Sequence, residues 1–374
     1  MIRILEIAPY KYLPARTGGE IGIADFATYL GRYSELTVAS VTANKPEGPL
    51  PYQLWKLFRD SRFRYLNPFY IGPLKQAIRN QQIDLLLIEH PYMGWMAVWL
   101  QALTGCSFVI HSRNIEGLRF KTMGKKWWLL LQAYEKWVHR KAAFSFFISQ
   151  DDAEEATSRY NLDPKKVGVA THGITPPVTI PDKQMLRQQL IRDHQLPADV
   201  VIYTFNGALG YLPNQQAVRM ITDKIYPLLE QRTNRPYVIL ISGKGLSADV
   251  VEKINQTNGK IIYTGFVPSI GDYLAGSDMF INPVVEGGGV KTKVLEALAW
   301  QKTVVSTASG ALGIHTAVCG SKLKIAGDDQ WEDFIALMLD LRDIDMEVPS
   351  AYFEYYSNDN IARSAIAVMQ SLVH

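Results

Sequence analysis

The chain of 374 residues lacks several features that mark other classes of protein. It has only two cysteines, Cys106 and Cys319, which lie far apart in the sequence. This excludes a disulfide framework or a cysteine metal cluster and fits a reducing cytoplasm. No window of 18 uncharged apolar residues is present, so we expect no membrane-spanning helix. Because residues 2–8 already have the pattern of a first strand, we also expect no secretion leader.

Common nucleotide-binding signatures are also missing. Neither half of the chain has Gly-x-Gly-x-x-Gly after its first strand with an acidic residue about twenty positions later, which argues against a dinucleotide oxidoreductase. The segment 287–293 is not a P-loop, because Val290 rather than glycine precedes Lys291. No aspartate-rich motif suggests a metal, so we expect none.

The net charge of +3 is unevenly distributed along the chain. Residues 1–180 hold 22 Lys and Arg against 15 Asp and Glu, a net +7, which leaves 17 against 21, a net −4, for the remainder. Basic and aromatic residues are interleaved at 55–65 and 121–128. This composition predicts peripheral contact with an anionic membrane, and the alternative is a basic face whose tryptophans point inward. We do not expect nucleic-acid binding.

Apolar strands alternate with helical segments in both halves of the chain, which is typical of parallel βαβ units. In the first half the pattern predicts strands at 2–8, 36–42, 84–89, 108–111 and 144–149, and helices near 21–32, 70–81, 92–103, 118–141 and 151–159. In the second half it predicts strands at 200–206, 237–242, 261–264, 279–282 and 303–306. The expected fold class is α/β, with two Rossmann-like, doubly wound parallel-sheet domains.

Three prolines among residues 174–181 interrupt this alternation and indicate an extended connector. We expect a first domain at 1–176, a linker at 177–181 and a second domain at 182–356. The final helix, 357–374, is expected to pack back towards the first domain. In two such domains the carboxyl ends of the strands would face a common cleft. One domain could then hold a ligand in the cleft, and the other could supply the group that attacks it.

Residues 278–300 carry the most informative chemistry. A short apolar strand ends at Pro283, and three glycines at 287–289 then let backbone N–H groups approach an anion. The helix that follows carries Lys291 and Lys293 in its first turn. Glu296 lies in an apolar stretch one turn later, where a carboxylate needs a partner such as a ribose diol. The simpler alternative is an ordinary helix in which Glu296 pairs with a lysine.

The order of the motifs resembles that of GT-B glycosyltransferases, specifically the retaining family 4 kind that builds bacterial cell-surface polysaccharides. Gly18 and Gly19 resemble the diglycine loop after that family's first strand. Further similar segments follow in the family's order, at 205–214, 241–245, 263–268, 273–278, 287–299 and 357–362. The resemblance covers nearly the whole chain. It implies that the first domain binds the acceptor and the second binds the donor.

The resemblance implies a nucleotide-diphosphate sugar as donor, a glycan or lipid-linked acceptor, and no cofactor. Glu296 would bind the ribose, residues 265–267 would face the base, and Lys291 or Lys293 would neutralise the leaving diphosphate. In this family the departing phosphate is thought to take the acceptor's proton. The implied donor-binding residues are Gly18, Gly19, Asn206, Gly207, Lys244, Gly265, Phe266, Val267, Gly288, Gly289, Val290, Lys291, Thr292 and Glu296, with Lys293 as a catalytic residue.

On the acceptor side, residues 111–116 resemble the family's His-Asn-x-Glu stretch, but Arg113 precedes the asparagine and His111 lies two positions earlier. Either of these two residues could fill the catalytic role of the family histidine. The other acceptor-side candidates are Glu20, His90, Asn114 and Glu116, and His172 is weaker.

Two further departures leave other functions open. Gly288 stands where the family has the first of two glutamates, and Glu286 is displaced by two residues. No Arg or Lys lies between Asn206 and Asn214, so other lysines must bind the diphosphate. The alternatives are a nucleotide-sugar epimerase, or a non-catalytic module that binds a nucleotide or a partner.

Overall fold

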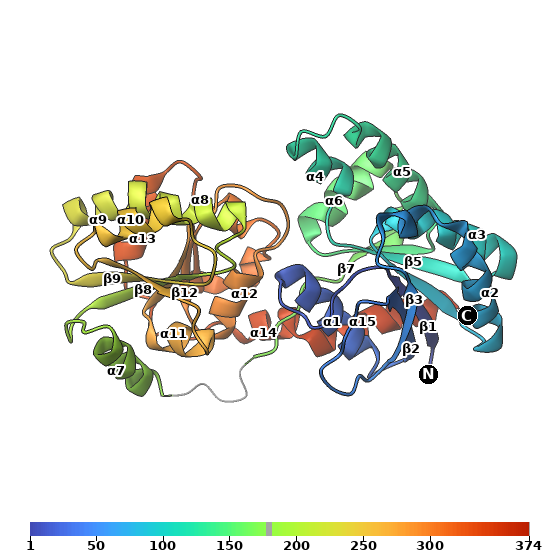
Figure 1. The fold of residues 1–374 in the computed structure, drawn as a ribbon, viewed down its shortest axis with the longest axis horizontal. Helices are drawn as coiled ribbons and strands as arrows, with labels where there is room; N and C mark the ends of the chain where they lie inside the picture. The colour runs from blue at the N-terminus through green and yellow to red at the C-terminus, as the bar shows by residue number, and fades with distance from the viewer. Residues whose placement is uncertain (177–181, 374) are drawn as a thin grey trace. The chain divides into compact units, whose positions relative to one another are not determined.

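The computed structural model describes residues 1–176 and 182–373, and the predicted linker at 177–181 lies outside the described residues. The chain divides into two compact units, Met1–Gly173 with Tyr356–His374, and Ile174–Tyr355. Each unit is built around a parallel sheet, with seven strands in the first and six in the second (Figure 1). The expected pair of Rossmann-like parallel-sheet folds is confirmed.

In the first unit the strand order is β3-β2-β1-β4-β5-β6-β7, and every pairing is parallel. The strands are β1 (Arg3–Ala8), β2 (Glu35–Val41), β3 (Gln53–Phe58), β4 (Leu85–Glu89), β5 (Ser107–Ser112), β6 (Phe144–Phe147) and β7 (Val167–Val169). The helices are α1 (Gly18–Leu30), α2 (Ile71–Asn80), α3 (Gly94–Thr104), α4 (Glu116–Thr122), α5 (Trp128–Lys141), α6 (Gln150–Tyr160) and α15 (Asn358–Ser371). The sheet is a nearly continuous apolar layer because helices cover both of its faces.

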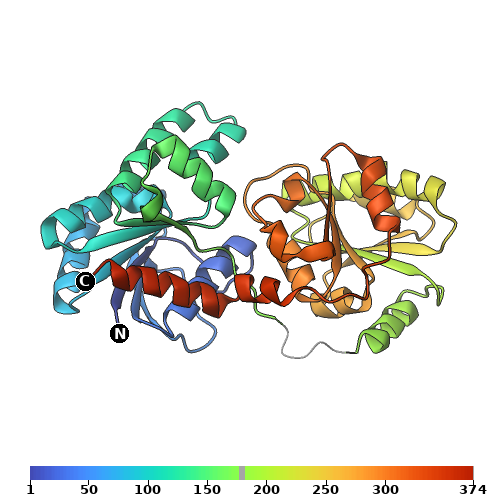
Figure 2. The same cartoon turned by 180° about the vertical axis from the view of Figure 1, so that it is seen from behind.

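Helices α1 and α15 lie on one face of this sheet and pack against each other (Figure 2). Phe26 and Leu30 of α1 and Ile366 of α15 belong to the same buried cluster. The hydroxyl of Tyr33, just after α1, donates a 2.5 Å hydrogen bond to Asp359 of α15. The last helix therefore packs on the first unit, as expected. Side chains of α2, α3 and α5 form a separate core on the other face.

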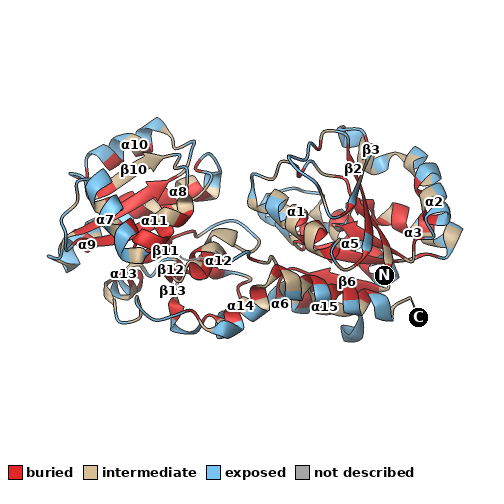
Figure 3. Cartoon of the chain, turned by 90° about the horizontal axis from the view of Figure 1, so that it is seen from below, coloured by how far each residue is buried: buried red, intermediate tan, exposed pale blue. Residues whose placement is uncertain are grey.

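In the second unit the strand order is β10-β9-β8-β11-β12-β13, again all parallel. The strands are β8 (Val201–Asn206), β9 (Tyr237–Ser242), β10 (Ile261–Gly265), β11 (Met279–Asn282), β12 (Thr303–Thr307) and β13 (Leu323–Ala326). The helices are α7 (Lys183–Asp193), α8 (Leu212–Met220), α9 (Tyr226–Arg232), α10 (Ala248–Asn255), α11 (Ile270–Gly276), α12 (Thr292–Ala299), α13 (Trp331–Leu339) and α14 (Ser350–Tyr356). Figure 3 shows the buried strands and the exposed outer faces of the helices.

The predicted helix at 118–141 was wrong, since this segment forms two helices, α4 and α5. Gly124, in the turn between them, has a φ of 68°, a left-handed conformation that an α-helix cannot include. The edge strands β3, β7 and β13 were not predicted, because short, partly exposed strands lack a clear apolar pattern. Within the described ranges, none of the helices has both the length and the apolar character needed to cross a membrane.

Candidate active site

The strand order of the second sheet reverses between β8 and β11, and parallel sheets of this kind bind ligands at the carboxyl ends of the strands beside such a point. The loop after β8 contains Gly207, and the loop after the neighbouring β9 contains Gly243. A Cβ atom on Gly243 would collide with the carbonyl oxygen of Gly207. The two loops are therefore in close backbone contact beside the switch point.

The three glycines predicted to bind an anion form the loop between β11 and α12. The Nζ atom of Lys291 donates hydrogen bonds to the carbonyl oxygens of Gly287 at 2.7 Å, Gly288 at 3.4 Å and Gly289 at 2.9 Å. Burial lowers the pKa of Lys291 to about 8. Lys291 therefore closes this loop on itself, just before α12 begins at Thr292.

Lys293 lies at the switch point itself. Its Nζ atom is 2.5 Å from Oδ1 of Asn214 and 4.4 Å from the centre of the Phe205 ring. The side-chain amide of Asn214 donates in turn to the carbonyl oxygen of Ala208. Burial, followed by the neighbouring charge of Lys291, lowers the pKa of Lys293 to about 7. An anion bound here would restore the ammonium form and gain a charge-assisted hydrogen bond.

Glu296 is one helical turn beyond Lys293, between buried residues of α12 such as Leu295 and Ala297. Its side chain is half-buried, and among residues 1–176 and 182–373 its carboxylate has no hydrogen bond or ion pair. The alternative that Glu296 pairs with a lysine was therefore wrong. Burial raises its pKa above the ordinary value. Because this partial burial disfavours the charged form, hydrogen bonds from a ligand with paired hydroxyl groups would stabilise the carboxylate.

The other predicted donor-binding residues of this unit lie at neighbouring strand ends and around the glycine loop. Lys244 Nζ stands 4.4 Å from the centre of the Phe266 ring, which is 66% exposed. The N–H of Gly243 donates to the carbonyl oxygen of Gly265 at 2.7 Å. Asn206 ends β8, and its Oδ1 atom is buried without a hydrogen-bond partner in the described part of the chain. Gly207, Val267, Gly288, Gly289, Val290 and Thr292 complete the set.

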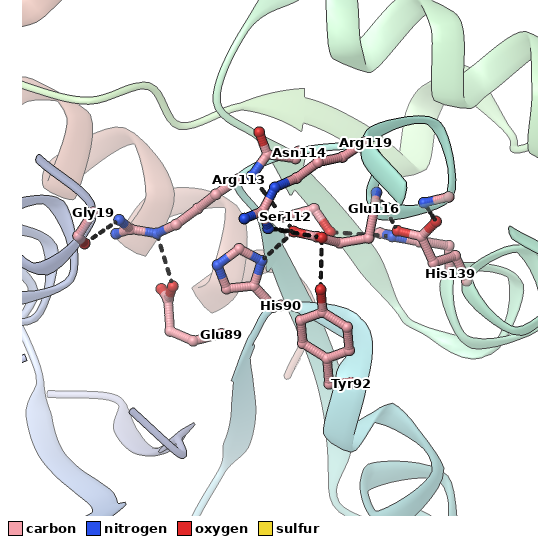
Figure 4. Close-up of polar contacts among 12 residues, drawn as sticks. Gly19, Glu89, His90, Tyr92, Ser112, Arg113, Asn114, Glu116, Arg119 and His139 are labelled. Carbon is pink, nitrogen blue, oxygen red and sulfur yellow. Dashed lines mark hydrogen bonds and ion pairs between the residues drawn. The ribbon is translucent and has the colours of Figure 1, made fainter. Parts of the chain in front are cut away.

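In the first unit, Glu89 at the end of β4 holds both predicted catalytic side chains, and Figure 4 shows its contact with Arg113. Its Oε1 atom is 2.7 Å from His111 Nδ1, and its Oε2 atom accepts a 3.2 Å hydrogen bond from Arg113 Nε. His111 Nε2 lies 3.0 Å from the carbonyl oxygen of Ala170, and Arg113 donates to the carbonyl oxygen of Gly19 at 2.8 Å. Burial alone would raise the pKa of Glu89, but the charges of His111 and Arg113 hold it well below its usual range. Both predicted catalytic side chains are therefore buried, and each contacts Glu89 and one backbone carbonyl oxygen.

A second buried carboxylate, Glu116, lies close to two other acceptor-side candidates, His90 and Asn114 (Figure 4). It accepts hydrogen bonds from the hydroxyl of Tyr92 at 2.6 Å and from Arg119 at 3.1 Å. Asn114 Nδ2 and His90 Nδ1 each lie 3.4 Å from its Oε1 atom. His90 has a φ of 62° and a ψ of 153°, a strained backbone conformation that is rare outside glycine and is often found at functional sites.

The N-terminal end of α4 fixes the position of Glu116. The carboxylate of Glu135, on α5, accepts the backbone N–H groups of Glu116 at 2.8 Å and Gly117 at 2.6 Å. It also accepts a 2.9 Å hydrogen bond from the hydroxyl of Tyr160. Burial raises the pKa of Glu135 to about 7, against the opposing effect of these three donors. Glu135 therefore ties α4 to α5 from inside the core.

Gly18 begins α1, and Glu20 completes a capping box by accepting the N–H of Thr17 at 2.9 Å. Glu20 therefore has a clear role in starting the helix. The ring of His172 lies against Gly22, and a Cβ atom added at Gly22 would collide with this ring. Burial lowers the pKa of His172 to about 3. Across the two described stretches, no group of three or more His, Cys, Asp or Glu side chains is placed to hold a metal ion.

Four residues that hold the predicted site residues in place were not predicted from the sequence: Glu89, Tyr92, Glu135 and Asn214. One signal was available for Glu89, because it ends an apolar strand beside the first sheet's switch point between β1 and β4. Asn214 and Glu135 gave no such signal, since each is a polar residue within a helix. Their importance depends on partners that are distant in sequence.

Residues 16–176 match the family described as Glycosyltransferase Family 4, and residues 201–343 match the family described as Glycosyl transferases group 1. The chain therefore carries two glycosyltransferase domains. A curated relative, an uncharacterized 44.6 kDa protein in the cps region of Klebsiella pneumoniae, is 32% identical over 131 residues. That alignment covers 33% of this chain and 33% of the relative, so the chain spans about a third of the length of the relative it matches.

Solved glycosyltransferases share the whole fold. A glycosyltransferase from Rickettsia africae is 16% identical with a TM-score of 0.71, covering 100% of this chain and 98% of its own. The lipopolysaccharide outer core galactosyltransferase WaaB is 12% identical with a TM-score of 0.70, covering 99% of both chains. Anabaena HepE, in complex with UDP, is 15% identical with a TM-score of 0.69, covering 99% and 100%. These similarities show that the fold is that of the GT-B glycosyltransferases.

Proposed function

We propose that the chain is a retaining glycosyltransferase that moves a sugar from a UDP- or GDP-linked donor to a glycan or lipid-linked acceptor in cell-surface polysaccharide or glycoconjugate synthesis. The observation that carries this proposal is the pair formed by Lys293 and Glu296, one turn apart on α12. The amino group of Lys293 lies beside Asn214, and Glu296 has no partner within the described residues. A nucleoside diphosphate would give both residues a partner, because its phosphates are an anion for Lys293 and its ribose has a diol for Glu296.

In the proposed step, the bond between the anomeric carbon and the β-phosphate oxygen breaks while the acceptor oxygen bonds to the same face of the sugar. The acceptor's proton passes to the departing phosphate oxygen, so the products are a glycoside and a nucleoside diphosphate. Lys293 and the positive end of α12 would stabilise the negative charge that develops on the diphosphate. We propose that they serve in place of a metal ion and that no cofactor takes part.

The acceptor would be bound by the first unit, near Glu116 and His90, at the inner face of the cell membrane. Two similar proteins support an acceptor at the cell surface. One is the relative in the cps region, and the other is the lipopolysaccharide outer core galactosyltransferase WaaB. HepE in complex with UDP supports a uracil nucleotide as the donor's leaving group. The basic and aromatic segments of the first unit support peripheral contact with an anionic membrane.

The first test is thermal unfolding of the purified protein with UDP, GDP, ADP and TDP. Because a ligand that binds only the native state stabilises it by mass action, one diphosphate at about 100 times its Kd should raise the melting temperature by about 5 °C or more. Incubation with the corresponding sugar nucleotide, without acceptor, should leave the sugar unchanged or release it slowly by hydrolysis. A changed sugar would indicate an epimerase, and no shift with any nucleotide would contradict donor binding.

Donor binding should weaken as the pH rises through 7 to 8. The pKa of Lys293 is about 7 in the free protein, so above this pH a proton must be taken up before the ammonium can meet the diphosphate. The affinity for a sugar nucleotide, whose own charge is constant in this range, should fall by up to about tenfold per pH unit. Calorimetry in buffers of different ionisation enthalpy would measure the proton uptake. A pH-independent affinity would contradict contact between Lys293 and the diphosphate.

A further inference from the structure

Three apolar side chains after β3 are unusually exposed. Phe63 is 80% exposed, Leu66 is 76% exposed and Phe69 is 84% exposed. They lie in two successive 3₁₀ turns, η1 (Arg62–Leu66) and η2 (Pro68–Tyr70), which lead into α2. We call residues 62–70 the apolar turn. Single exposed apolar residues are common, but three within seven positions form a patch that calls for a partner.

The backbone of the apolar turn is held by specific contacts. Arg64 Nε donates to the carbonyl oxygen of Pro9 at 2.8 Å, and Trp95 Nε1 donates to the carbonyl oxygen of Tyr65 at 2.8 Å. The side chains of Ser61 and Asn67 accept the N–H groups of Phe63 and Phe69 and so cap the two turns. The apolar side chains are therefore presented outward by an anchored backbone.

The charge around the apolar turn identifies the kind of partner. Residues 56–79 contain six Lys and Arg but one acidic residue, Asp60, which pairs with Arg64. A surface that is both apolar and basic suits the interface of an anionic bilayer, where apolar groups enter the acyl boundary and cations meet the phosphates. A second copy of this chain would bring like charges together, which disfavours a dimer through this surface.

The inner side of the same turn faces the acceptor-side residues. The ring of Tyr65 lies 6.4 Å from that of Tyr10 and 5.9 Å from that of Tyr92, measured between centres. The ring of His90 is 5.4 Å from Tyr10 and 6.0 Å from Tyr92. Tyr92 donates its hydroxyl hydrogen bond to Glu116. A single turn thus carries apolar groups towards solvent and an aromatic side chain towards Glu116.

We propose that the apolar turn inserts into an anionic lipid bilayer and so brings the head of a lipid-linked acceptor to the cluster of Tyr10, Tyr65, His90 and Tyr92. Phe63, Leu66 and Phe69 enter the bilayer, while Tyr65 provides an aromatic surface for the head group. The membrane contact is inferred from the exposed apolar residues and from the positive charge around the apolar turn. The statement about the acceptor rests on the proposed function.

The test is co-sedimentation of the full chain with vesicles of phosphatidylglycerol and phosphatidylcholine, and with phosphatidylcholine alone. The wild type should bind the anionic vesicles more tightly, and binding should weaken with salt. The triple variant Phe63→Ser, Leu66→Ser, Phe69→Ser should lose at least about tenfold in vesicle affinity. The matched control is Met185→Ser with Met346→Ser in the second unit, which are 56% and 53% exposed and should lose less than about threefold.

Two further measurements separate this proposal from the proposed function. The triple variant should keep the melting temperature of the wild type and its shift with nucleotide, which shows that it is folded and binds the donor. Tyr65→Ala should lower transfer to a lipid-linked acceptor about tenfold or more without changing vesicle binding or donor hydrolysis. If no nucleotide changed the melting temperature but the wild type bound vesicles as expected, the proposed donor binding would be refuted and the membrane contact would still be supported.

Several outcomes would overturn the membrane proposal. The proposal would be contradicted directly if the wild type did not bind anionic vesicles, or if the triple variant bound them as tightly as the wild type. Loss of binding in the control variant alone would place the membrane contact on the second unit. A wild-type dimer in light scattering that the triple variant converts to monomer would make this surface an interface between copies of the chain.

Discussion

Replacing Glu296 by alanine is expected to raise the Kd for the donor's nucleoside diphosphate at least about 100-fold. If the carboxylate accepts hydrogen bonds from both ribose hydroxyls, the variant loses two charged hydrogen bonds worth about 1.5–3 kcal/mol each. The same carboxylate is partly buried and, in the described residues, unpaired, so its removal should not destabilise the free protein. Nucleotide affinity should therefore fall without a loss of thermal stability, as measured by calorimetry and thermal unfolding.

The pH dependence of stability gives an independent check on Glu296. Burial raises the pKa of this group in the folded state, so the native protein binds more protons than the unfolded chain at pH values between the two pKa values. The free energy of unfolding contributed by this group falls as the pH rises through that interval. Glu296→Gln should remove this fall. A variant less stable than the wild type at neutral pH would mean that Glu296 has a partner in the native state.

A thermodynamic cycle identifies the ribose as the ligand of Glu296. The wild type should bind the 2′-deoxy analogue of the diphosphate about tenfold or more weakly than the ribonucleotide, because one hydroxyl is missing. In Glu296→Ala, which can contact neither hydroxyl, this difference should disappear. The matched control is Glu286→Gln in the glycine loop. Its exposed carboxylate accepts, among the described residues, a single hydrogen bond, from Gln216, and the variant should change affinity less than about threefold. An undiminished difference in Glu296→Ala would place the ribose elsewhere.

The parts of the site that follow one another in the sequence could be predicted. The strand β11, the glycine loop and α12 are contiguous, so the spacing of Lys291, Lys293 and Glu296 already placed them on one helix beside an anion-binding loop. The alternation of strands and helices likewise gave two parallel sheets, because each βαβ unit is a local pattern. The edge strands β3, β7 and β13 were missed, because they are short and partly exposed, and the break between α4 and α5 was missed as well.

The environments of these residues could not be predicted, because they depend on contacts between distant positions. Nothing near Lys293 in the sequence shows that its ammonium meets Asn214, 79 residues earlier. Nor does the segment around His111 reveal that its imidazole and Arg113 share the buried carboxylate of Glu89. The catalytic roles expected of these two residues therefore stay predictions, and the geometry shows them linking β4, β5 and the start of α1.

Replacing Lys293 by methionine, which keeps the length of the side chain and removes its charge, is expected to lower kcat by about 100-fold to 1,000-fold. The loss follows from the developing charge on the leaving diphosphate, since removal of one preorganised electrostatic group costs about 2.7–4 kcal/mol. Initial rates of sugar transfer or donor hydrolysis would measure it. Burial lowers the pKa of Lys293 from its ordinary value of 10.5 to about 7, so the unfolded chain binds more protons across this interval. Lys293→Met should therefore be more stable than the wild type at pH 7.

The matched control for Lys293 is its neighbour Lys291, which carries the same charge two positions earlier. Because Lys291 donates to the carbonyl oxygens of the glycine loop, Lys291→Met should loosen that loop and raise KM more than it lowers kcat. The two variants thus separate a lysine that stabilises the transition state from one that shapes the binding loop. If Lys291→Met instead lost kcat while Lys293→Met kept it, the roles would be exchanged. The diphosphate would then have to displace Lys291 from the loop carbonyls before the sugar could be transferred.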